Sequence, residues 1–131
     1  MDINDSSGKP PLNFQPTGHR RVIYKTSRAP TPLGPYNQAV RVDDTLYISG
    51  QVGVILGTKN LLNSVEDQTT QIFTYLEEIL KVAGGGFNNV VRTTVYLYDM
   101  NDFSAVNEIY EKYFPKNAPA RVAFQVKQRK Y

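Results

Sequence analysis

One arginine, Arg121, stands where its side chain could take part in chemistry. It follows a short segment marked by Pro115 and Pro119, and it precedes residues 122–126, in which apolar residues alternate with Ala and Gln. Such alternation is typical of a strand, whereas the prolines end any preceding helix. We therefore expect a strand that opens with Arg121 at a loop-to-strand junction, where scaffolds commonly present functional side chains.

The residues before this loop predict a short amphipathic helix that helps to position Arg121. Either Asn101 or Asp102 could cap its first turn, and the two prolines stop its continuation. Four residues recur at spacings of three and four, which places them on one helix face: Phe103, Val106, Tyr110 and Tyr113.

The first third of the chain predicts strands around one loop of fixed shape. Three prolines and one glycine within residues 27–36 are incompatible with a regular element. Asp43-Asp44 is a turn signal between two alternating segments, which predicts a hairpin. The expected strands are a short edge strand at residues 21–26 and the hairpin strands at residues 38–42 and 45–49.

Residues 64–82 give the clearest helix prediction. Ser64, with Asp67 three residues on, resembles a capping box, and Gly84 suits the left-handed position just past a helix end. Because these glycines follow the helix rather than precede it, they make a poor phosphate cradle. One apolar stripe is wide enough to cover a sheet: Ile72, Phe73, Leu76, Ile79, Leu80 and Ala83.

Residues 89–98 are rich in β-branched and aromatic residues, which predicts a strand. We expect the face formed by Val91, Thr93, Val95 and Leu97 to be covered by a helix. The other face is mixed in character and includes Tyr96 and Tyr98. The order hairpin, helix, strand, helix, strand predicts an α+β fold, in which one sheet carries two helices on one face.

Composition excludes several kinds of site. The chain has 131 residues, enough for one domain with a single core. It has no Cys and one His, His19, so we expect no disulfide, no thiolate nucleophile and no metal site. No apolar run approaches the roughly 20 residues of a membrane span, and the N-terminus resembles neither a secretory nor a transit signal. The expected location is cytoplasmic, with no membrane association.

The positive net charge of +3 lies towards the ends of the chain. Residues 22–126 hold nine basic and ten acidic residues, whereas the last five residues, KQRKY, hold three basic ones. A basic tail could add weak, salt-sensitive affinity for RNA, but a solvated terminus is the favoured interpretation. We expect a flexible extension at residues 1–20, a domain at residues 21–126 and a basic tail at residues 127–131.

Four motifs in order resemble the Rid family of reactive intermediate deaminases, also called YjgF or RutC-like proteins, and most closely its animal branch. They are SxxAPxxxGPYxQAV from Ser27, YISGQ from Tyr47, VVRTTVYLYDMNDFxxVNEIYEKYF from Val90, and PAR at residues 119–121. The resemblance implies a chorismate-mutase-like α+β protomer that assembles as a homotrimer with clefts between subunits. It also implies hydrolysis of 2-imino acids or their enamine tautomers (2-iminobutanoate, 2-iminopropanoate) to 2-keto acids and ammonia, without a metal or organic cofactor.

The resemblance also implies roles for particular residues. Arg121 matches the arginine that binds the substrate carboxylate, and a planar guanidinium suits that task because it offers two parallel donors. Tyr36 matches a cleft tyrosine contributed by the adjoining subunit. The cleft wall corresponds to Ser49, Gly50 and Asn107, and the main chain at Ala123 corresponds to a carbonyl near the imine nitrogen.

The chain departs from the family pattern after the PAR strand. Relatives continue through an LPKG-type loop into a strand containing EIEA, whose Glu is thought to position the water, whereas this chain ends in KQRKY. We expect that final strand to be missing from between the hairpin and residues 89–98, leaving two unpaired edges. Imine deamination with weakened catalysis is the leading interpretation. An RNA-cleaving or translation-inhibiting protein and a non-catalytic subunit that mixes with full-length protomers remain alternatives.

Overall fold

The computed structural model describes residues 20–127 and confirms the α+β class. Its five strands are β1 (Arg21–Tyr24), β2 (Ala39–Val42), β3 (Thr45–Ile48), β4 (Arg92–Leu97) and β5 (Ala120–Gln125). The helices are α1 (Val65–Val82) and α2 (Phe103–Tyr113), with short 3₁₀ turns η1 (Phe87–Asn89) and η2 (Met100–Asp102). The expected extension at residues 1–20 and the tail at 127–131 fall almost entirely outside the described residues.

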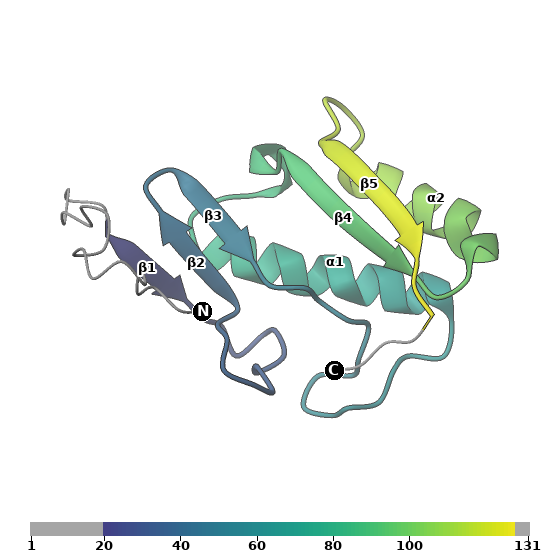
Figure 1. Ribbon diagram of the computed structural model, residues 1–131, viewed down its shortest axis with the longest axis horizontal. Helices are drawn as coiled ribbons and strands as arrows, with labels where there is room; N and C mark the ends of the chain where they lie inside the picture. The colour runs from purple at the N-terminus through teal and green to yellow at the C-terminus, as the bar shows by residue number, and fades with distance from the viewer. Residues whose placement is uncertain (1–19, 128–131) are drawn as a thin grey trace, which may run out of the picture.

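The strands form two sheets rather than the one sheet that their order predicts, and they divide between the hairpin and β4, where the family resemblance implied two unpaired edges. Strands β1, β2 and β3 make an antiparallel sheet in that order, and β4 pairs in parallel with β5. Strands β3 and β4 run in the same direction in Figure 1, yet each has hydrogen-bonded neighbours on one side only among the described strands. The two edges that were expected to be unpaired are therefore the facing edges of separate sheets.

Helix α1 begins and ends as its sequence predicts. The Ser64 side chain accepts a hydrogen bond from the Asp67 backbone N–H at 3.0 Å, the N-cap geometry that satisfies a free donor of the first turn. At the other end Gly84 has a φ of +83°, and the Gly84 and Gly85 N–H groups donate to the carbonyls of Lys81 and Leu80. This pair of bonds is the Schellman motif, which favours glycine.

One helix joins the two sheets into a single protomer (Figure 1). Tyr75 and Ile79 of α1 pack with Ala39 of β2, and Phe73 of the same helix packs with Tyr110 of α2. The predicted apolar stripe did not include Tyr75, although its side chain is among the most deeply buried. Its hydroxyl donates to the Val54 carbonyl at 2.6 Å, which allows a polar atom inside the core.

The C-terminal half differs in detail from the predictions. Residues 87–89 form a 3₁₀ turn, so β4 is shorter than predicted, and Val91 is 80% exposed rather than covered by a helix. The Asp102 side chain makes no capping bond to α2. Asp99 instead accepts from the Asn101 N–H and caps the preceding 3₁₀ turn, because the chain enters α2 through that turn rather than directly.

Within the described residues, no helix is long and apolar enough to cross a membrane.

Candidate functional site

Arg121 is the second residue of β5, one position inside the strand that it was expected to open. It pairs in register with Thr93 of β4, so both side chains lie on the side of the sheet that faces α2. Its Nη1 donates a hydrogen bond to Asn107 Oδ1 at 2.6 Å. The guanidinium carbon also lies 4.7 Å from the centre of the Tyr110 ring and 5.4 Å from that of Phe103. Both distances are within cation–π range.

Helix α2 explains why these partners meet at one arginine. Phe103, Asn107 and Tyr110 are spaced by four and three residues, which aligns them along one face of a helix. The predicted apolar stripe therefore includes the two rings, while Asn107 supplies the polar partner. The sequence indicated this face but not that a guanidinium would lie against it.

A cavity of about 410 Å³ opens beside this arginine. Arg121 and Glu111 provide its charged groups, so the cavity can offer a guanidinium to an anion and a carboxylate to a cation. Most of the remaining wall comes from the end of α2 and the loop that follows it: Asn107, Tyr110, Phe114, Pro115, Ala118 and Pro119.

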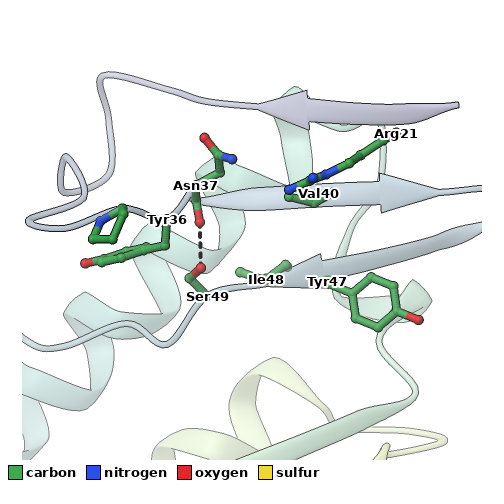
Figure 2. A pocket seen from close by; sticks show the side chains of 8 residues that line it. Arg21, Tyr36, Asn37, Val40, Tyr47, Ile48 and Ser49 are labelled. Carbon is green, nitrogen blue, oxygen red and sulfur yellow. Dashed lines mark hydrogen bonds between the residues drawn. The ribbon is translucent and has the colours of Figure 1, made fainter. Parts of the chain in front are cut away.

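Tyr36 and Ser49 line a different cavity, of about 330 Å³ (Figure 2). The Ser49 hydroxyl donates to the Asn37 carbonyl at 2.6 Å, which ties the end of β3 to the loop before β2. The Tyr36 side chain lies on that loop, and its hydroxyl accepts a bond from the Leu33 N–H at 3.3 Å. Figure 2 shows Tyr36 at one end of the cavity and Tyr47 at the other.

The structure thus brings the predicted residues together in two groups rather than one. Arg121 and Asn107 share the first cavity, Tyr36 and Ser49 share the second, and no residue within 20–127 lines both. Gly50 directly follows Ser49, is exposed, and has open space where a Cβ would stand. Ala123 is partly buried and pairs with Val95, on the same face of β5 as Arg121.

Sequence reasoning missed a buried glutamine that fixes the loop carrying Tyr36. Gln38 is 4% exposed. Its Oε1 accepts from the Thr26 N–H at 2.7 Å, and its Nε2 lies 3.0–3.2 Å from the carbonyl oxygens of Thr26, Ala29 and Pro30. One side chain therefore satisfies several backbone groups of a proline-rich loop that has no regular hydrogen bonding of its own.

Gln38→Ala is expected to lower the free energy of unfolding by about 2–4 kcal/mol, because it leaves these buried backbone groups without partners. Urea unfolding measures the change. The control is Gln51→Ala, which removes a single bond from Nε2 to the Ser49 carbonyl and is expected to cost about 0.5–1.5 kcal/mol. Equal losses for the two variants would show that Gln38 does not hold the loop.

Comparison with known proteins gives a consistent answer. The family model described as endoribonuclease L-PSP matches residues 26–130. A mouse protein named 2-iminobutanoate/2-iminopropanoate deaminase is 53% identical over 107 residues, which make up 81% of this chain and 79% of the mouse protein. Reactive Intermediate Deaminase A, chloroplastic, from Arabidopsis thaliana is 43% identical over 125 residues, which make up 92% of this chain and 67% of that protein.

A solved structure agrees with these sequence matches. The crystal structure of E. coli TdcF with bound serine is similar with a TM-score of 0.78 and 32% sequence identity, covering 82% of this chain and 87% of that chain. The motifs around Tyr36, Ser49 and Arg121 led to the same family. The chain therefore belongs to the Rid family, whose members are also described as YjgF or RutC proteins.

Proposed function

We propose that this protein hydrolyses 2-imino acids to 2-keto acids and ammonia, with Arg121 binding the substrate carboxylate. The observation that carries the proposal is that two contacts hold the Arg121 guanidinium at the wall of a cavity. It donates a hydrogen bond to Asn107 and lies over the Tyr110 ring. The mouse relative's name, 2-iminobutanoate/2-iminopropanoate deaminase, supports the same class of substrate.

The Arg121 guanidinium has N–H donors that remain available for a substrate carboxylate. One Nη1 donor is used by Asn107, and a guanidinium carries five N–H groups in a rigid plane. Two parallel bonds to a carboxylate fix both the position and the plane of the substrate. Because 2-iminobutanoate has its imine carbon next to the carboxylate, anchoring one group also orients the other.

Beyond this placement of the substrate, hydrolysis of the imine needs few catalytic groups from the protein. A protonated imine carries positive charge, so its C2 carbon is already electrophilic. The oxygen of a water molecule adds to C2 and a proton is lost to solvent. A proton from solvent then moves to the nitrogen, the C–N bond breaks with its electron pair on nitrogen, and the hydroxyl proton passes to the released ammonia, which gives ammonium and the 2-keto acid. Holding water and imine in a reactive geometry supplies much of the acceleration, and the Ala123 carbonyl is the proposed acceptor near the nitrogen.

We also propose that the complete site forms between subunits of a homotrimer. Among the described residues the Arg121 and Tyr36 cavities share no lining residue, and in the proposed trimer one cleft combines these two cavities from adjoining protomers. The side of the sheets facing away from the helices supports such association, because it exposes several large apolar residues: Ile23, Tyr47, Tyr96, Val122 and Phe124. We further propose that Tyr36, Ser49 and Gly50 of one subunit face Arg121 and Asn107 of the next.

A pair of imines that differ in the carboxylate tests this function. The enzyme is expected to accelerate the loss of 2-iminobutanoate and to leave the imine of butanone, which lacks the carboxylate, at its spontaneous rate. The comparison monitors ammonia release over a buffer blank. Equal acceleration of both imines would contradict carboxylate recognition by Arg121.

RNA cleavage is a second candidate, favoured by the description of the matching family model as an endoribonuclease. Cleavage that survives repurification and is lost in Arg121→Ala would support it. If the RNA cleavage disappears when the protein is repurified, the nuclease activity belongs to a contaminant. The cytoplasmic location and the absence of a cofactor stay predictions.

A further inference from the structure

A pair of hydroxyl groups lies directly behind Arg121. Thr93 Oγ1 and the Tyr110 hydroxyl oxygen are 2.7 Å apart, and one donates to the other. Tyr110 is 8% exposed, and its ring packs edge to face against Phe73, with centres 5.8 Å apart. The hydroxyl bond therefore joins a buried aromatic side chain of α2 to a side chain of β4.

Each residue of this pair adjoins the proposed carboxylate-binding residue. Thr93 is the register partner of Arg121 on the adjacent strand, and Tyr110 provides the ring over which the guanidinium lies at 4.7 Å. Asn107 Oδ1 also accepts a hydrogen bond from Arg121 Nη1 at 2.6 Å. The ring against which the Arg121 side chain lies is thus held by the hydroxyl bond to Thr93 as well as by its packing against Phe73.

We propose that Thr93 and Tyr110 are positioning residues that set the orientation of the Arg121 guanidinium for the substrate carboxylate. The inference rests on the proposed function. An arginine side chain has many rotamers, and bidentate recognition of a carboxylate needs one plane. Neither hydroxyl needs to touch the substrate: Thr93 holds the Tyr110 ring, and the ring holds the guanidinium.

Removing either hydroxyl tests the proposal with small changes in shape. Tyr110→Phe and Thr93→Val are each expected to lower kcat/KM for 2-iminobutanoate about tenfold, mainly through a higher KM, as is usual for groups that orient a binding residue. The double variant should lose no more than either single variant, because both remove the same bond. Thr93→Ser keeps the hydroxyl and should retain most of the activity.

A matched control separates positioning from stability. Tyr75→Phe removes a buried tyrosine hydroxyl bonded at 2.6 Å to the Val54 carbonyl, in the core cluster that does not contact Arg121. It should lower stability about as much as Tyr110→Phe while leaving KM unchanged. A rise in KM with Tyr75→Phe equal to that with Tyr110→Phe would overturn the proposal.

A readout independent of catalysis keeps the two proposals distinguishable. The Nε–H signal of Arg121, assigned by its loss in Arg121→Lys, reports the order of the side chain by NMR relaxation. We expect lower order in Thr93→Val and Tyr110→Phe, and wild-type order in Thr93→Ser and Tyr75→Phe. Unchanged order in the first two overturns the positioning role. If Arg121 is less ordered in these two variants but the wild-type protein hydrolyses no imine, the positioning of Arg121 is retained and only the deaminase function is rejected.

Discussion

Arg121→Ala is expected to lower kcat/KM for 2-iminobutanoate about 10²- to 10³-fold. Charge-assisted hydrogen bonds contribute roughly 1.5–3 kcal/mol each, and a bidentate pair is lost. The expected fold-change corresponds to a barrier increase of about 3–4 kcal/mol, in the lower part of the range of about 3–6 kcal/mol for two such bonds. Much of the effect should be in kcat as well as KM, because the same contact orients the imine carbon towards water.

Two further variants define what the guanidinium contributes. Arg121→Lys retains the charge but not the planar pair of donors, so it should restore only a small part of the lost activity. Arg41→Ala is the matched control, since Arg41 is an exposed arginine in β2 that lines neither cavity. Full activity in Arg121→Lys would show that a positive charge alone suffices, and a similar loss in Arg41→Ala would indicate a general effect of charge.

A mixture of two inactive variants is expected to regain activity. If each cleft combines Arg121 of one subunit with Tyr36 of the next, Arg121→Ala and Tyr36→Ala damage opposite halves of the same site. In trimers assembled at random from equal amounts, about a quarter of the clefts contain two intact halves, since the interface is heterologous. Unfolding the variants together and refolding them should therefore give about a quarter of wild-type activity.

The controls for this experiment are the variants refolded separately and then combined, which should stay inactive. Wild-type protein treated in the same way gives the reference activity. Activity in the mixture no higher than the average of the two variants would contradict a site shared between subunits. In that case the site that contains Arg121 would use no Tyr36 from an adjoining subunit.

Local signals predicted the helices well because the residues that decide them lie close together in sequence. Ser64, Asp67 and Gly84 define the ends of α1 through bonds within a few residues. Sheet pairing depends on residues that are far apart, and the alternation in β3 and β4 does not say which strand each one pairs with. The unpaired edges between the hairpin and β4 were therefore expected from the family resemblance and not from the alternation itself.

The candidate site shows the same limit. A loop-to-strand arginine was predicted, and the structure places Arg121 one residue inside β5. The helical spacing of Phe103 and Tyr110 was visible, but the contact of their rings with the guanidinium depends on how α2 packs beside β5. The separation of Tyr36 from Arg121 within one protomer was expected from the family resemblance alone, since nothing in the spacing of these residues indicates it.

The most direct test of the central claim is the lifetime of 2-iminobutanoate in the presence of the purified protein. A threonine dehydratase generates the imine, and the time courses of its loss and of ammonia release are followed together. The proposed function predicts that the rate of loss rises in proportion to protein concentration and that ammonia and 2-oxobutanoate form in equal amounts. A lifetime equal to that in buffer, at every protein concentration, would contradict it.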